Sequence, residues 1–266
     1  MGLERIDNRD IDGLKELQPE GWTDIRPYFY YYLGSEFCEA LKITQGKNIM
    51  AIGTTIRHEE SAWLAHIIVH QNFRNKGLGR EIASSLIEGL DKDKYKTVYL
   101  DATDMGYPVY KKLGFEIETE YIHLDGDYVD NPLTDPEAII PFHEGFRDQI
   151  LELDRLISGE NRLMVLKPHL TTALLYVSDR KLLGTYFPKL FDGLIIAVDT
   201  LAGTELIKLR MRTTNSARFP ITNYNASDFL LDNGYKQIRT SKRMILGEKR
   251  KWRAEAIFNR VSGGLG

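Results

Sequence analysis

The segment that most restricts the fold of this chain covers residues 69–80 and reads VHQNFRNKGLGR. A run of apolar residues, 62–69, precedes it and predicts a β-strand. An amphipathic stretch over about 78–90 follows it and predicts an α-helix. The chain therefore has to turn directly from a buried strand into a helix at a point rich in glycine.

This turn has the composition of a phosphate-binding site. Gly77 and Gly79 remove side chains where the helix begins, so that successive N–H groups can point at one anion beside the positive end of the helix dipole. Arg74, Lys76 and Arg80 surround the turn with positive charge. Neither the Walker pattern GxxxxGK[ST] nor the three-glycine dinucleotide pattern is present.

Strand and helix signals alternate on both sides of this turn. In the first half they predict helices over about 9–17, 21–32 and 107–113, and strands over 37–43, 49–57, 97–102 and 115–124. In the second half they predict helices over 144–156 and 162–166, and strands over 172–178, 181–187 and 194–198. Three dipeptides typical of turns lie within 125–136, which makes this segment a predicted linker.

Two segments of the first half have counterparts in the second half. The segment from Tyr110 to Phe115 aligns with the segment from Leu230 to Tyr235, 120 residues later, and each contains a glycine just before its last residue. Earlier in the halves, Gly53 within MAIGT aligns with Gly184 within LLGT. These pairs predict that the second half repeats the fold of the first.

The quoted residues resemble the GNAT superfamily of N-acetyltransferases. Its loop pattern, V-x-x-x-x-(Q/R)-x-x-G-x-(G/A), is complete here, from Val69 to Gly79. A second family pattern, N-x-x-A-x-x-x-Y-x-x-x-G-F, is matched by Tyr110, Gly114 and Phe115. Its Asn and Ala are replaced by Thr103 and Gly106, which depart from the family but are of similar size.

This resemblance implies an α/β (α+β) fold with two GNAT-like domains, each a mixed, mostly antiparallel sheet flanked by helices. The predicted domains are a catalytic domain over 1–126 and a divergent one over 136–266 that has no CoA motif. In the divergent domain, Asp199 stands where the loop would follow its strand, and a carboxylate there would repel a pyrophosphate. Leu230 stands at the position of Tyr110 and cannot donate a proton.

By the same resemblance, acetyl-CoA is the expected co-substrate and no metal is implied. The predicted CoA-binding residues are Ile67, Ile68, Val69, Arg74, Asn75, Lys76, Gly77, Leu78, Gly79, Arg80, Thr103, Gly106 and Tyr110. Tyr110 is the predicted general acid, because a phenol at hydrogen-bond distance can protonate the departing CoA thiolate. The expected reaction is direct transfer of an acetyl group to a primary amine, with a small molecule or an amino acid favoured over a protein.

The general base is less well defined. His66 is the titratable residue of the strand that ends at Val69, but regular alternation would place it on the face opposite Trp63 and Ala65, where the family tends to place a base. A solvent-relayed proton is therefore the favoured alternative. Further candidates are His58, Glu59 and Asp101.

Trp22 and Tyr28 are the predicted acceptor contacts, with core packing as the alternative. They belong to an aromatic cluster that also includes Tyr30, Tyr31 and Tyr32. The alternative functions are an acyl-CoA-binding sensor without turnover and a scaffold.

Composition sets the remaining expectations. A formal net charge of -3 gives no electrostatic case for nucleic acid or an anionic membrane as a partner. One cysteine, Cys38, excludes an intramolecular disulfide. No apolar run reaches the roughly 20 residues of a membrane helix, and we expect a cytoplasmic protein. The oligomeric state is left open.

Overall fold

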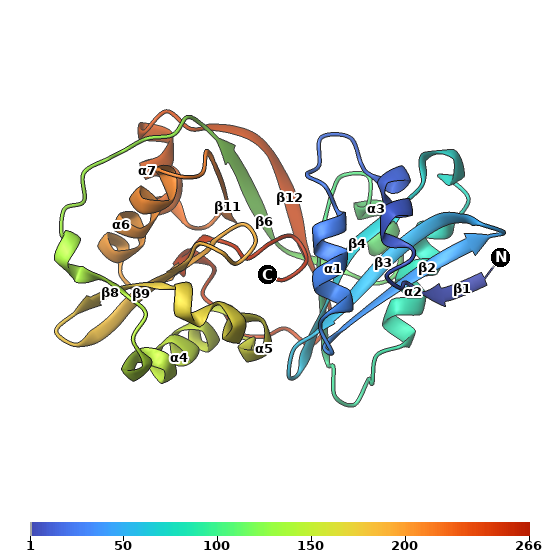
Figure 1. Cartoon of the computed structure of the whole chain (residues 1–266), viewed down its shortest axis with the longest axis horizontal. Coiled ribbons are helices and arrows are strands. Elements are labelled where there is room, and N and C mark those ends of the chain that lie inside the picture. The colour runs from blue at the N-terminus through green and yellow to red at the C-terminus, as the bar shows by residue number, and fades with distance from the viewer. Residues whose placement is uncertain (1) are drawn as a thin grey trace. The chain divides into compact units, whose positions relative to one another are not determined.

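The computed structural model describes residues 2–266, in two compact units that interleave along the chain (Figure 1). The first unit contains the residues up to Ile117 together with 244–249 and Leu265. The second contains 118–243, 250–264 and Gly266. Each unit thus takes a strand segment from the other half of the sequence. The prediction of two continuous domains, 1–126 and 136–266, stays a prediction.

The first unit is built around a sheet with helices beside it. Its elements are β1 (Gly2–Arg5), a 3₁₀ helix (Ile11–Leu17), α1 (Arg26–Leu33), β2 (Cys38–Gln45), β3 (Asn48–Arg57), β4 (Ser61–Val69), α2 (Leu78–Glu88), β5 (Thr97–Ala102) and α3 (Tyr107–Lys112). Strands β1 to β4 pair antiparallel in chain order, and β4 pairs parallel with β5. Beside β5, the amide of Glu248 donates to the carbonyl of Lys96 at 2.9 Å.

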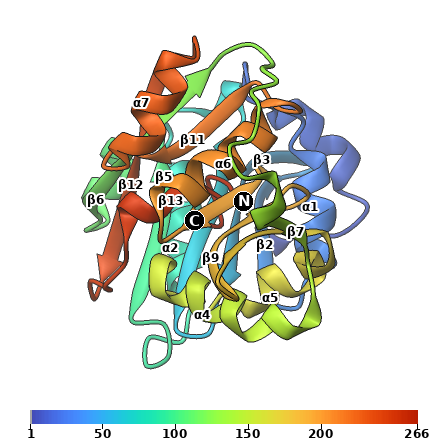
Figure 2. The ribbon, with the colours of Figure 1, turned by 90° about the vertical axis from the view of Figure 1, so that its left-hand side faces the viewer.

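The second unit has a five-stranded sheet in the order β13-β10-β9-β8-β7 and a separate pairing of β6 with β11. Its elements are β6 (Glu116–Asp125), β7 (Ile139–Pro141), α4 (Arg147–Ser158), α5 (Leu163–Leu166), β8 (Leu174–Ser178), β9 (Lys181–Phe187), β10 (Leu194–Ala197), α6 (Thr200–Met211), β11 (Ser216–Pro220), α7 (Tyr224–Asp232), β12 (Lys236–Gly247) and β13 (Ile257–Asn259). The first two residues of β6 and the last four of β12 belong to the first unit. Helices α4 and α6 both pack on β9 and β10, from opposite faces (Figures 1 and 2). The predicted fold class, mixed and mostly antiparallel sheets flanked by helices, is confirmed.

The repeat seen in the sequence has a counterpart in hydrogen bonding within each unit. Gly114 follows α3 with a φ of 92°, and the next amide, that of Phe115, donates to the carbonyl of Tyr110 at 3.1 Å. Gly234 follows α7 with a φ of 84°, and the amide of Tyr235 donates to the carbonyl of Leu230 at 3.0 Å. A left-handed glycine that closes a helix in this way is a common C-terminal cap.

Glycine also sets how closely helix and sheet approach each other in the first unit. A Cβ built on Gly53 of β3 would lie 2.8 Å from Leu86 Cδ1 and 3.2 Å from Ile82 Cγ1, both on α2. The helix therefore packs directly against the strand backbone. In the second unit, a Cβ on Gly184 of β9 would lie 3.1 Å from Leu206 Cδ1 of α6.

We expect Gly53→Val to lower the free energy of unfolding by about 1–3 kcal/mol, because the added Cβ and its two methyl groups would push α2 away from β3. Urea unfolding measures this change. The matched control is Gly13→Ala in the exposed 3₁₀ helix, where an added Cβ meets nothing within 4 Å. Equal stability of the two variants would contradict the close approach of α2.

Candidate active site at the end of strand β4

The candidate site begins where two neighbouring strands stop pairing. The parallel register of β4 with β5 covers Ser61 to Leu64 against Thr97 to Leu100. Strand β4 nevertheless continues to Val69, and β5 continues to Ala102. The second half of β4 therefore has an edge that β5 does not cover, and its N–H and C=O groups can pair with an extended ligand.

A β-bulge lies on the same part of β4. Ile68 pairs with Ile52 and Ala65 pairs with Thr54, so that two residues, His66 and Ile67, stand opposite one residue of β3. His66 has a φ of 48°, in the left-handed region that non-glycine residues rarely adopt. Such bulges redirect side chains and are frequent next to active sites.

The bulge overturns the assumption of regular alternation at His66. Leu64 and Ile67 both pack into the cluster beneath α2, although they are three residues apart. His66 instead contacts aromatic rings of α1 and of the segment before it. The prediction that His66 faces away from the side used by Trp63 and Ala65 was therefore wrong, because it assumed an uninterrupted pleat.

Four aromatic side chains surround the His66 ring, and we refer to them as the aromatic cluster. Their ring centroids lie 4.7–6.1 Å from that of His66, and they belong to Trp22, Tyr28, Phe29 and Tyr32. The Tyr32 hydroxyl lies 2.9 Å from His66 Nδ1. Burial among these rings lowers the pKa of His66 to about 4, because the charged imidazolium is disfavoured there.

The two predicted acceptor contacts, Trp22 and Tyr28, therefore do lie together and next to His66. Trp22 is 39% exposed, and Tyr28 is half-buried. Phe29 and Tyr32 are part of the same cluster, although the predicted site did not include them. Tyr32 lies four residues after Tyr28 and three after Phe29 on α1, and this spacing is the signal that places it next to both.

The turn after β4 has the geometry predicted for an anion site. Asn75 and Gly77 have φ values of 61° and 84°, and Gly77 caps the N-terminus of α2, an 11-residue helix. Within residues 2–266, the amides of 75–79 donate to no protein group. Alternating left- and right-handed residues point successive N–H groups into one concavity, which favours an anion.

Basic side chains lie on this turn as predicted. Arg74, Lys76 and Arg80 are all exposed. Arg74 Nε lies 3.4 Å from the carbonyl of Val69, and Lys76 Nζ lies 5.2 Å from the centre of the Phe73 ring. A Cβ on Gly79 would meet only Val69 Cγ2, at 3.6 Å, so this glycine is not required by packing within the chain.

Tyr110 lies in the core cluster between α2 and β5 and is 8% exposed. Burial and the nearby Asp101 carboxylate raise the pKa of its phenol well above the ordinary value, so that it stays protonated. Its ring lies over Gly106, where a Cβ would approach Cε2 at 2.8 Å. Thr103 Oγ1 accepts from the Gly106 amide at 3.2 Å, which fixes the turn into α3.

Two of the further base candidates lie elsewhere. His58 and Glu59 are in the hairpin that connects β3 to β4, where the His58 amide donates to the carbonyl of Ser61 at 2.8 Å. About 3.3 Å per residue separates Ser61 from His66 along the strand, so this hairpin is distant from the bulge.

The second unit has no counterpart of the anion turn. Its helix α6 starts directly after β10, and the side chain of Asp199 accepts from the Ala202 amide at 2.9 Å. A carboxylate therefore occupies the N-terminus of the helix that corresponds in order to α2. Leu230, at the position of Tyr110, is buried in an apolar cluster.

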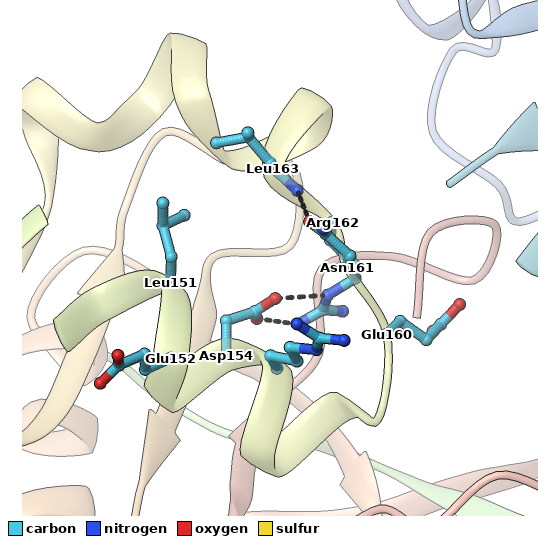
Figure 3. A pocket seen from close by; sticks show the side chains of 8 residues that line it. Leu151, Glu152, Asp154, Glu160, Asn161, Arg162 and Leu163 are labelled. Atoms are coloured by element: carbon cyan, nitrogen blue, oxygen red, sulfur yellow. Dashed lines mark hydrogen bonds and ion pairs between the residues drawn. The ribbon is translucent and has the colours of Figure 1, made fainter. Parts of the chain in front are cut away.

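A cavity of about 170 Å³ in the second unit is lined by residues of α4 and of the segment that follows it (Figure 3). Asp154 and Arg162, both almost fully buried, form an ion pair on its wall. Arg162 also donates through Nε to Asp154 Oδ2 at 3.2 Å. We interpret this pair as a link between α4 and α5, because removal of one partner would leave a buried charge uncompensated.

Comparison with known proteins agrees with this geometry. A family model described as an acetyltransferase (GNAT) domain matches residues 34–126, which include β4, the anion turn and Tyr110. No curated protein matches the sequence.

Among residues 2–266, no cluster of His, Cys, Asp or Glu could hold a metal ion. None of the described helices has the length and hydropathy of a membrane span.

Solved structures show the same fold over nearly the whole chain. A putative acetyltransferase from Pyrococcus horikoshii superimposes with a TM-score of 0.84 at 18% identity, over 99% of this chain and 95% of that one. A GCN5-related N-acetyltransferase from Anabaena variabilis superimposes with a TM-score of 0.57 at 10% identity, over 92% of this chain and 72% of that one. A putative acetyltransferase from Thermoplasma acidophilum superimposes with a TM-score of 0.56 at 13% identity, over 93% of this chain and all of that one. Residues 34–126 therefore match the family model of a GNAT acetyltransferase domain, and the likeness of the full chain to solved structures is one of fold.

The burial of His66 predicts how stability depends on pH. Its folded pKa lies below the unfolded value of roughly 6.5, so the unfolded state binds more protons as the pH falls. We expect the free energy of unfolding to fall between about pH 6.5 and pH 4, by on the order of 1 kcal/mol from this residue. Urea unfolding at pH 7.5 and pH 5 should show a smaller fall for His66→Gln, and parallel behaviour of the two proteins would contradict the burial of the ring.

Proposed function

We propose that this chain is an acetyl-CoA-dependent N-acetyltransferase that acts on a primary amine. The observation that carries the proposal is the anion turn at the start of α2, where five successive amides, Asn75 to Gly79, have no protein partner among residues 2–266. A pyrophosphate is an anion of suitable charge for such a site. The uncovered edge of β4 starts directly beside it and suits the extended pantetheine arm.

The proposed positions follow from the geometry of the strand. The arm would pair with Val69, Ile68 and Ile67, and its thioester would then reach the bulge at His66. Three residues of strand span roughly 10 Å, which an extended chain of amide and methylene groups can follow. Trp22 and Tyr28 lie beside the bulge, and we propose that the acceptor amine binds against them.

The proposed chemistry is direct attack. The amine nitrogen adds to the thioester carbonyl carbon, the C–S bond then breaks, and the thiolate takes the proton of the Tyr110 phenol, which is later restored from solvent. The nitrogen of the tetrahedral adduct loses its extra proton to water, and the amide carbonyl re-forms as the thiolate leaves. Burial makes Tyr110 a weaker acid, but the same burial raises the pKa of the thiol, so the two groups stay matched for proton transfer.

We further propose that the second unit is a divergent GNAT-like domain that does not bind CoA. The matching caps after α3 and α7 support a common fold, and Asp199 at the start of α6 supports the loss of the anion site. A small-molecule amine or an amino acid is the proposed acceptor.

Two variants separate binding from chemistry. We expect Tyr110→Phe to lower kcat by about 10²-fold or more, as for loss of a general acid, with the Kd for acetyl-CoA changed less than about 3-fold. Gly79→Trp should abolish binding, because an indole would cover the amides of the turn. Calorimetry gives the Kd, and thiol release with a panel of amines gives the rate.

The control for these measurements is Gly79→Ala, whose methyl group would make only an ordinary contact with Val69 and so should leave the unfolding temperature unchanged. If the two test variants lost acetyl-CoA affinity equally, the separate roles of Tyr110 and Gly79 would be refuted. Absence of any binding heat with the folded wild-type protein would refute the function itself.

A further inference from the structure

His66 has one ring nitrogen bound within the protein and one that is not. Nδ1 lies 2.9 Å from the hydroxyl of Tyr32, a residue that is 2% exposed. Over the described chain, 2–266, Nε2 has no protein partner, and the ring is partly exposed. The accessible corner of this ring is therefore the one that carries Nε2.

The hydroxyl of Tyr32 decides which nitrogen is protonated. Within the described residues, His66 Nδ1 is the one acceptor within reach of this hydroxyl. If Nδ1 carried the proton, the Tyr32 hydrogen would be buried without an acceptor, at a cost of roughly 1–3 kcal/mol. The network therefore favours Tyr32 O–H donating to Nδ1, which leaves the proton on Nε2.

A base role does not fit this arrangement. In the neutral ring, Nε2 is then a donor and cannot accept a proton from an amine. Burial also leaves the pKa of His66 at about 4, far below that of an ordinary alkylammonium. The aromatic cluster around the ring carries no charge, and among the described residues no carboxylate pairs with His66 that could raise the pKa.

We propose that His66 is a catalytic hydrogen-bond donor, whose Nε2–H binds the oxygen of the acyl thioester carbonyl, and that Tyr32 is the positioning residue that holds this tautomer. The inference rests on the proposed function, which brings the thioester to the bulge. As the amine adds to the carbonyl carbon, negative charge collects on the oxygen, and the Nε2–H bond strengthens without proton transfer. A neutral imidazole held in place in a poorly solvated site is suited to that role.

The bulge in β4 gives the His66 ring the orientation that this contact requires. A regular strand would have turned His66 toward α2, into the apolar cluster that contains Leu64. With the bulge, the ring lies beside α1, two residues beyond Leu64, the last residue of β4 that pairs with β5. The backbone at His66 is strained, with a φ of 48°, and strained residues cluster at active sites.

The first test is NMR of the full chain labelled with ¹⁵N-histidine, with His66 assigned from the spectrum of His66→Gln. We expect a neutral ring with protonated Nε2 from pH 5.5 to pH 9. Tyr32→Phe should shift the Nδ1 signal toward that of a nitrogen without a donor. A dominant Nδ1–H form, or protonation near pH 6.5, would overturn the inference without reference to activity.

The second test uses the carbonyl itself. Addition of acetyl-CoA should move the Nε2–H proton signal, whereas CoA, which lacks the acyl carbonyl, should leave it near its original position. Equal shifts with both compounds would overturn the proposed contact. This result needs binding but no turnover, so it distinguishes failure of the donor role from failure of the acetyltransferase proposal.

The third test compares two substitutions on the same left-handed backbone. His66→Gln keeps an N–H donor but cannot titrate, and we expect kcat within about 10-fold of wild type. His66→Ala should lower kcat by about 10²–10³-fold with an unchanged KM for acetyl-CoA and an unchanged pH profile. Equal losses in both variants, with loss of a low-pH limb, would show a base instead of a donor.

Discussion

The bulge of β4 opposite Gly53 is the constraint on which the rest of the site depends. It inserts one residue into the strand, so that Ile67 reaches the cluster beneath α2 while His66 turns to α1. It also lies where the pairing of β4 with β5 has just ended. Gly53 allows α2 to lie close against this part of the sheet. One local irregularity thus sets the open edge, the helix packing and the orientation of the histidine.

Much of this architecture could be predicted from the sequence because it depends on local chemistry. The bounds predicted for Thr97–Ala102 and Lys181–Phe187 agree with β5 and β9, since short apolar runs between turn residues define strands directly. The anion turn was equally readable, because glycine and basic residues at a strand–helix junction allow few other structures. The short edge strand β1 was not predicted, because its pairing with β2, not its composition, stabilises it.

The site residues whose positions could not be predicted from the sequence depend on long-range structure. His66 was placed on the wrong face because a bulge does not change the apolar pattern of a strand. Gly53, which lies opposite the bulge, does not indicate it either, because a glycine at that position can also be explained by helix packing. Tyr32 was visible as one of several tyrosines, but its hydrogen bond to His66 joins residues 34 positions apart. The interleaving of the two units likewise arises from long-range pairing, which periodicity within one segment does not encode.

Helices α2 and α6 differ in how their N-terminal amides are satisfied. In α6, Asp199 satisfies the amide of Ala202, so the helix supplies its own anion. In α2, Gly77 has no side chain to do this, and the amides of the turn rely on solvent or on a ligand. Because the turn is exposed, water can satisfy these groups at little cost in stability. In α6 the Asp199 cap contributes about 1 kcal/mol. The two helix N-termini therefore differ through the one residue before each helix, Gly77 or Asp199.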